Sequence, residues 1–470
     1  MQISINNEDK NKYGIVYTPE PLVNKILDLI PKEYYQNPNL KWLDIGAGNG
    51  AFTLNLYSRL INDLSNVLPN IETRKIHILE KMITMCEIYP PHIQKLYQLF
   101  SCKANIITKD FLKVGLTDSN ESYYDIIIGN PPYNINGKIK TPTNNEIKKS
   151  NDGKQSYVGF VNKSLTLLKP GGLLALIIPT LWMKPDKADL YNSLISKNFS
   201  IKALVCLSTT QTLKEFAYQA QIPTCYFYGI LNNPQNNPQN NLQKTIKVYD
   251  SCNKTTINYL IRPDYPIPTH GINIINKLLY YVDKIGYLQV YKTNSPPQKS
   301  LFSNEECENN KFKNIKTTKL LEKTPLLIIN YSNCAQAFSN IPKLIMAHKM
   351  YGFPYLDSSG IYGISSRDNY ILTTKDYNLY ELQQIQAFLS TKTALFIFST
   401  TTYRMRYLER YAFQFIPNIT KLHNFPNLLN LNSVEREKII SSFFNFSAIE
   451  EEKINSSFNN YKHFIDKNLL

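Results

Sequence analysis

The stretch YDIIIGNPPY, residues 124–133, joins a short apolar run to a proline-rich turn. Its three consecutive isoleucines predict a buried β-strand over residues 124–128. The two prolines at positions 131 and 132 cannot continue the hydrogen bonding of a strand, so the strand must end before them. Asn130 and Tyr133 are therefore expected at the carboxyl end of a buried strand, which is where open α/β sheets bind their ligands.

Further apolar runs surround this strand, at residues 42–45, 76–80, 104–108, 173–178, 201–207 and 224–230. Helical patterns lie between them at residues 21–29, 51–64, 81–97 and 158–168. This alternation predicts a doubly wound, mostly parallel α/β sheet. The last two runs lie close together after a helix, which favours an antiparallel strand at the edge of the sheet.

A polar repeat, NNPQNNPQNN at residues 232–241, interrupts the alternation and predicts a linker. We expect one domain over residues 1–231, a linker over 232–242 and a second domain over 243–470. The second half has short β-type runs at 325–330 and 343–347, a turn at 357–360 and helical patterns near 380–391 and 447–467, which predict an α+β fold.

Composition restricts the class of protein. A formal charge of +15 on 470 residues favours a polyanionic partner, although a generally basic surface gives the same number. The seven cysteines are scattered without metal-binding spacing, so we expect neither disulfides nor a metal site. The longest apolar run, residues 171–183, is too short to span a bilayer, which favours a protein of the cytoplasm or of another compartment containing DNA.

Polar residues also follow the other predicted strands. Residues 44–50, DIGAGNG, form a glycine-rich turn into a helix, a pattern that serves NAD, FAD and methyl donors alike or is simply a tight turn. Glu80 ends the second predicted strand, where an acid can accept hydrogen bonds from ribose hydroxyls or can be a solvated loop residue. Asp110 and Phe111 follow the third, and offer a carboxylate and a ring to an adenine, although a phenylalanine there is more often core.

The order of these motifs resembles that of the gamma-class adenine-N6 DNA methyltransferases of the TaqI type. The resemblance covers the first half closely and the second half only in size and position. It implies a Rossmann-like methyltransferase sheet, S-adenosyl-L-methionine as cofactor, double-stranded DNA as partner and a target recognition domain over residues 243–470.

The resemblance also implies roles for single residues. The cofactor would contact Thr18 in GIVYTP (residues 14–19) and, in the glycine turn, Asp44, Gly46 and Ala47. Glu80 would bind its ribose, Asp110 and Phe111 would hold its adenine, and Pro132 of the tetrapeptide would also contact it. Asn130, Pro131 and Tyr133 would be catalytic. A second aromatic residue would stack on the flipped base, with Phe216 the best match and Tyr218 its competitor.

The chemistry can be given from the residues. The lone pair of an adenine amino group is delocalised into the ring, and the base must leave the duplex before it can react. The Asn130 side-chain oxygen and the Pro131 carbonyl can accept both amino protons, which localises the lone pair on nitrogen. Stacking on Tyr133 and Phe216 would recover on the order of 1–3 kcal/mol per contact. Positioning is most of this catalysis, so we assign no metal and no general base.

Other functions stay open at this point. NPPY also serves methyltransferases that act on RNA or on a protein glutamine, and a decayed enzyme could merely bind DNA. The lysine-bearing segment 134–156 could close over DNA or be a solvated insertion, and the basic and aromatic stretch 403–411 could contact phosphates or be an amphipathic helix. We expect a monomer, with a separate cognate restriction endonuclease as a possible partner.

Overall fold

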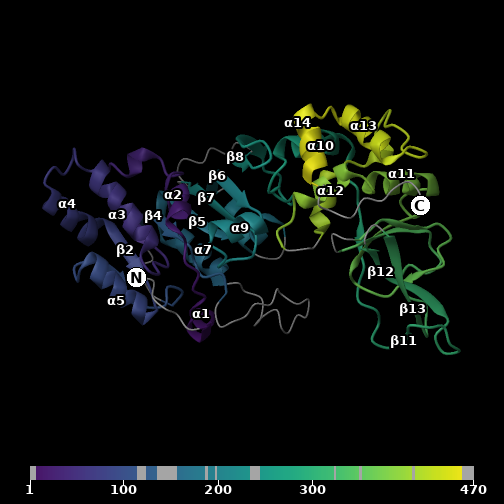
Figure 1. Ribbon diagram of the computed structural model, residues 1–470, viewed down its shortest axis with the longest axis horizontal. Helices are drawn as coiled ribbons and strands as arrows, with labels where there is room; N and C mark the ends of the chain where they lie inside the picture. The colour runs from purple at the N-terminus through teal and green to yellow at the C-terminus, as the bar shows by residue number, and fades with distance from the viewer. Residues whose placement is uncertain are drawn as a thin grey trace. The chain divides into compact units, whose positions relative to one another are not determined.

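The computed structural model describes residues 7–113, 123–134, 156–185, 189–195, 198–232, 244–321, 324–348, 352–404 and 408–457. The chain divides into two compact units (Figure 1). The first comprises Met1–Tyr249 with Thr255–Arg262, and the second Asp250–Lys254 with Pro263–Leu470. No helix in these described ranges is long and apolar enough to cross a membrane.

The described part of the first unit holds one nine-stranded sheet in the order β3-β2-β1-β4-β5-β7-β6-β8-β9. The strands are β1 (Trp42–Asp44), β2 (Ile83–Cys86), β3 (Asn105–Ile107), β4 (Tyr124–Gly129), β5 (Leu168–Pro179), β6 (Phe199–Leu207), β7 (Thr224–Leu231), β8 (Thr245–Asp250) and β9 (Thr255–Leu260). β1 to β5 pair in parallel, whereas β7 is antiparallel to both β5 and β6. The predicted α/β class is confirmed, but the antiparallel strand lies inside the sheet and not at its edge.

Helices surround this sheet. They are α1 (Asn7–Tyr13), α2 (Glu20–Leu27), η1 (Lys32–Tyr34), α3 (Ala51–Asp63), α4 (Ile71–His77), α5 (Pro90–Phe100), α7 (Ser156–Leu167), η3 (Thr180–Met183), α8 (Asp189–Ile195) and α9 (Thr209–Glu215), with a π-helical turn, η2 (Ile78–Met82). Buried side chains of α2 and α3, such as Leu22 and Leu56, pack against Trp42, Ile126 and Ile128 of the central strands. This packing fixes the loops that follow β1 and β4.

The predicted second strand was wrong. Residues 76–80 fall in α4 and η2, and the strand is Ile83–Cys86, inside the segment predicted as a helix over 81–97. Asn70 caps α4 by accepting a hydrogen bond from the Thr73 amide at 3.0 Å. The helix therefore begins before the apolar run at residues 76–80 and continues into it. Pro90 and Pro91 open α5 because the first helical turn needs no amide donor there.

The division between the units lies later than the expected linker at 232–242. β8 pairs in parallel with β6, so the sheet continues beyond the polar repeat. Residues 233–243 lie outside the described residues. A polar repeat gives no information on whether the chain beyond it returns to the same sheet.

The second unit is α+β, as expected. Its described strands form two four-stranded sheets, β10-β17-β14-β15 and β11-β13-β12-β16. They are β10 (Tyr291–Lys292), β11 (Phe302–Ser303), β12 (Phe312–Leu321), β13 (Thr324–Ser332), β14 (Lys343–Ala347), β15 (Tyr355–Asp357), β16 (Gly363–Ile364) and β17 (Asn369–Thr373). The helices are α10 (Ile272–Ile285), α11 (Leu379–Leu389), α12 (Lys392–Ser399), η5 (Arg410–Phe415), η6 (Ile419–Lys421), α13 (Ser433–Phe444) and α14 (Ala448–Ser457).

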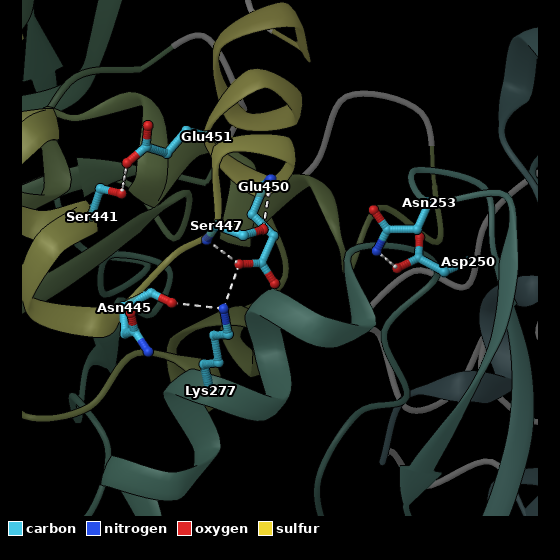
Figure 2. A network of polar contacts seen from close by, with 8 residues as sticks. All are labelled: Asp250, Asn253, Lys277, Ser441, Asn445, Ser447, Glu450 and Glu451. Carbon is cyan, nitrogen blue, oxygen red and sulfur yellow. Dashed lines mark hydrogen bonds and ion pairs between the residues drawn. The ribbon is translucent and has the colours of Figure 1, made fainter.

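Polar contacts join the helices of this unit (Figure 2). Lys277 of α10 donates to Glu450 of α14 at 2.5 Å and to the Asn445 carbonyl at 2.7 Å, and Ser441 donates to Glu451. Glu450 is 4% exposed, and Lys277 is the partner of its buried carboxylate. These contacts fasten α14 to α10 and α13.

Asp250 explains why residues 250–254 belong to the second unit. Its carboxylate accepts hydrogen bonds from the amides of Gly271 at 3.0 Å and Ile272 at 2.9 Å, at the start of α10. Of the basic and aromatic stretch 403–411, Tyr403 is buried and donates to the Ile267 carbonyl at 2.5 Å, while η5 begins at Arg410. Residues 405–407 lie outside the described residues.

Candidate active site

The ends of β1 to β4 enclose a cavity of about 370 Å³. The glycine turn after β1, the residues after β2 and β3, the tetrapeptide after β4 and the segment after α1 all line it. From these loops the lining residues include Gly46, Gly48, Glu87, Ile88, Asp110, Phe111, Asn130, Pro131, Pro132 and Tyr133, together with Lys12, Tyr13, Gly14, Ile15, Val16 and Tyr17. Four parallel strands and the segment after α1 thus bring residues from five separate segments to one site.

The side-chain amide of Asn130 has a hydrogen-bond partner for its nitrogen but none for its oxygen among the described residues. Its side-chain nitrogen donates to the Thr18 hydroxyl at 3.0 Å. Its side-chain oxygen is buried and has no hydrogen-bond partner among the described residues. Thr18 itself is only 8% exposed and does not line the cavity, so its contact with Asn130 is its connection to the site.

Gly14 brings the segment before Thr18 against the tetrapeptide. Its φ is +66°, and a Cβ atom there would lie 2.2 Å from the Asn134 carbonyl oxygen. Any other residue would push the two segments apart. This close approach positions Thr18 beside Asn130.

Tyr133 lies at the cavity with its ring mostly covered. It is 7% exposed, packs edge-on against Tyr157 at 6.4 Å between ring centroids, and its hydroxyl has no partner in the described residues. Burial raises the pKa of this hydroxyl well above its usual range, so the ring is neutral. A neutral aromatic face is what a base can stack on.

An aromatic wall closes another side. Phe111 and Phe160, the latter on α7, stack at 5.0 Å with 22° between their planes, and the Lys163 ammonium lies 5.3 Å from the Phe111 ring centre. Phe160 was not identified from the sequence, where it is one apolar residue of a helical pattern. Asp110 lies beside Phe111 and accepts a hydrogen bond from the Leu112 amide at 3.0 Å.

The glycine turn divides into an exposed and a buried part. Gly46 lines the cavity, whereas Ala47 is 5% exposed and Asp44 only 1%. Asp44 accepts a hydrogen bond from the Thr53 hydroxyl at 2.8 Å, and its other oxygen is unpaired within the described residues. Burial raises the pKa of Asp44 to about 7, against the opposing effect of the Thr53 hydrogen bond.

The structure does not bring Glu80 to the cavity. Glu80 lies in η2 and pairs with Lys103 at 3.7 Å, because the strand begins only at Ile83. Glu87, the residue after β2, lines the cavity at the position where Glu80 was expected. Glu87 accepts hydrogen bonds from the Gly48 amide at 2.7 Å and from the amides of Ile88 and Tyr89 at 2.8 Å each. The two prolines at 90 and 91 were the signal that a strand, and not a helix, precedes them.

Phe216 is also absent from the site. Its ring is fully buried in the core of the first unit, beside Ala220 and Tyr226. Tyr218 is 74% exposed and has a φ of +67°, which a tyrosine rarely adopts. Two successive left-handed residues, Ala217 and Tyr218, therefore turn the first aromatic side chain inward and expose the second.

The strand order 3-2-1-4-5-7-6 with an antiparallel seventh strand is that of the class I methyltransferase fold. Residues 51–212 match the model of the Eco57I restriction-modification methylase family, and the resemblance to gamma-class adenine methyltransferases is confirmed.

Three relatives illustrate the match. The chain is 26% identical over 216 residues to the type II methyltransferase M.PaeR7I of Pseudomonas aeruginosa, covering 42% of this chain and 37% of the relative. It is 28% identical over 224 residues to the type II methyltransferase M.BstVI of Geobacillus stearothermophilus, covering 42% and 39%. It is 26% identical over 243 residues to an uncharacterized adenine-specific methylase of Mycoplasma pneumoniae, covering 36% and 55%. The chain thus spans well under two thirds of the length of each.

Asp44→Asn is expected to make folding less sensitive to pH. The folded-state pKa of Asp44 is raised to about 7 from an ordinary 3.8, so its contribution to stability is complete below about pH 4 and is lost as pH rises through 7. Asparagine stays neutral, so the variant should gain on the wild type by up to about 4 kcal/mol towards pH 8. Urea denaturation from pH 4 to 8 measures this, with the exposed Asp28→Asn as control. A difference in unfolding free energy between Asp44→Asn and the wild type that stays constant across this pH range would contradict the raised pKa of Asp44.

Proposed function

We propose that this protein is a site-specific DNA methyltransferase that transfers a methyl group from S-adenosyl-L-methionine to the N6 amino group of a flipped adenine. The observation that carries the proposal is the Asn130 amide, whose nitrogen is held by Thr18 and whose oxygen is buried without a partner among the described residues. A buried, unpaired acceptor costs about 1–3 kcal/mol, and such a cost is tolerated where a ligand supplies the missing donor.

An exocyclic amino group is a donor that fits this acceptor. It carries two protons, and the Pro131 carbonyl beside Asn130 can accept the second. With both protons held, the lone pair of the nitrogen is no longer conjugated with the ring and becomes available as a nucleophile. The two prolines lack backbone donors that would compete for these oxygens.

The cavity fits a methyl donor of this kind. Glu87 would accept from the ribose hydroxyls, Asp110 would accept from the adenine amino group, and Phe111 with Phe160 would cover the adenine ring. Gly46 and Gly48 leave room for the chain that carries the sulfonium. When bound, the donor supplies a methyl group on an already activated leaving group, so alignment of acceptor and methyl is the main task of the protein.

The flipped base would lie between Tyr133 and Tyr218. Tyr133 faces the cavity, and Tyr218 is the exposed aromatic of the loop between α9 and β7. The positive φ of Tyr218 supports this choice, since unusual backbone at an exposed aromatic residue indicates a functional constraint. This assignment replaces Phe216, whose buried ring cannot reach a base without leaving the core.

Double-stranded DNA as acceptor is supported by three further facts. The net charge is +15, the family model that matches is that of a restriction-modification methylase, and the matching relatives include type II methyltransferases. We assign target recognition to the second unit. A separate restriction endonuclease and a monomeric enzyme remain parts of the proposal.

The proposal is tested by expressing the chain in a host without DNA methylation and reading the plasmid by modification-sensitive single-molecule sequencing. The expected result is N6-methyladenine in one short sequence context, lost in Asn130→Ala and retained in Asn134→Ala, a nearby asparagine outside the tetrapeptide. Unmodified DNA from folded protein that binds the donor would contradict the proposal and would favour RNA or protein glutamine as acceptor.

Glu87→Gln is expected to weaken S-adenosylhomocysteine binding by roughly tenfold or more, because a carboxylate that accepts from ribose hydroxyls contributes about 1.5–3 kcal/mol. Glu80→Gln, at the surface beside Lys103, should leave the affinity within about twofold of the wild type. Isothermal titration calorimetry measures both. Equal losses in the two variants would remove Glu87 from the ribose site.

Tyr218→Ala is expected to lower kcat/KM for a duplex carrying the target site on the order of tenfold, since one base–aromatic stack contributes about 1–3 kcal/mol. Tyr218→Phe should keep most of the activity. Phe216→Leu, a core substitution, should lower the melting temperature with little effect on kcat/KM. The reverse pattern, with activity insensitive to Tyr218, would assign the stacking role elsewhere.

A further inference from the structure

A buried histidine lies beside the acid of the cavity. His92, in the first turn of α5, is 1% exposed. Its Nε2 lies 3.0 Å from the Tyr17 hydroxyl, and its Nδ1 lies 3.6 Å from Oε2 of Glu87. Both partners line the cavity, one after β2 and one in the segment after α1. The histidine therefore bridges two of the loops that form the site.

Within the described residues the His92 ring makes one hydrogen bond, between its Nε2 and the Tyr17 hydroxyl. A carboxylate oxygen accepts hydrogen bonds, so we assign the tautomer with its proton on Nδ1, the nitrogen that faces Glu87. In this tautomer Nε2 accepts from the Tyr17 hydroxyl. Burial raises the pKa of Tyr17, aided by Tyr89 and Glu87, so the phenol keeps the proton that it donates.

The orientation of the ring is fixed from the other side. Tyr89 packs edge-on against His92 at 4.9 Å with 84° between the planes, and the Tyr89 hydroxyl donates to Asp9 at 3.1 Å. Nδ1 of His92 has no hydrogen-bond partner within the described residues, and 3.6 Å to Glu87 exceeds a hydrogen bond. In the assigned tautomer the Nδ1 proton therefore faces the Glu87 carboxylate and is donated to no other group of the described residues.

We propose that His92 is a positioning residue that orients the Glu87 carboxylate towards the ribose of the methyl donor and couples it, through Tyr17, to the segment that holds Asn130. The inference rests on the proposed function. Tyr17 precedes Thr18 in the chain, and Thr18 accepts from the Asn130 nitrogen at 3.0 Å. One continuous set of contacts therefore joins the donor pocket to the acceptor of the amino group.

Backbone amides hold both oxygens of the Glu87 carboxylate, and His92 adds a side-chain contact to one of them. Oε1 accepts from the amides of Ile88 and Tyr89, and Oε2 accepts from the Gly48 amide. His92 is the side chain within ion-pair distance of Oε2 in the described structure, and outer partners of this kind fix the direction in which a carboxylate presents its remaining lone pairs.

The test measures ribose discrimination and not affinity alone. Titration calorimetry on the full chain compares S-adenosylhomocysteine with its 2′-deoxy analogue. The wild type should prefer the ribose form by roughly tenfold. His92→Phe, which keeps a ring but has no polar atoms, should reduce the ratio to about two or less, whereas His92→Gln, whose amide can both donate and accept, should restore most of it. Tyr17→Phe removes a single hydroxyl and should give an intermediate ratio.

The outcomes separate this inference from the function on which it rests. A His92→Phe variant that binds both ligands more weakly by the same factor, with the wild-type ratio intact, would make His92 a packing residue and overturn the inference. Folded wild-type protein that binds neither ligand would overturn the proposed function as well. Loss of the ratio in His92→Phe together with its recovery in His92→Gln would support the coupling.

Discussion

The hydrogen bond from the Asn130 nitrogen to the Thr18 hydroxyl joins two segments 112 residues apart in sequence and orients the group on which the site depends. With the nitrogen occupied, the amide can turn only its oxygen towards a ligand. Gly14 makes this contact possible because a side chain at its position would collide with the Asn134 carbonyl. The unpaired oxygen of Asn130, which would be a defect in a purely structural asparagine, is then an acceptor that a ligand can occupy.

The sheet supplies everything else around that bond. Because β1, β2, β3 and β4 run parallel, each delivers the residues after its last position to the same edge. The glycine turn, Glu87, Asp110 and the tetrapeptide meet there although they are spread over almost ninety residues of the chain. The buried isoleucines of β4 and the helices α2 and α3 keep this edge rigid, and a rigid edge suits a reaction whose rate depends on alignment.

The parts that sequence predicted are those governed by local rules. The strand before NPPY and the turn after β1 follow from apolar runs that end in prolines or glycines, and the structure has both where expected. The sequence placed Glu80 at the end of the second strand, where the structure has Glu87, because two apolar runs lie close together; only the cap at Asn70 and the prolines at 90 and 91 distinguish helix from strand there. The direction of Phe216 could not be predicted, since it depends on two left-handed residues after α9, and neither is a glycine. The return of β8 to the sheet depends on tertiary pairing and leaves no local pattern.

A crystal structure of the chain with the non-reactive donor analogue sinefungin and a duplex carrying its target site would show what the Asn130 oxygen binds. We expect an extrahelical adenine whose amino nitrogen lies about 3 Å from the Asn130 side-chain oxygen, with its ring against Tyr133. An adenine that remains stacked in the duplex, or a different group bound at the Asn130 oxygen, would contradict it.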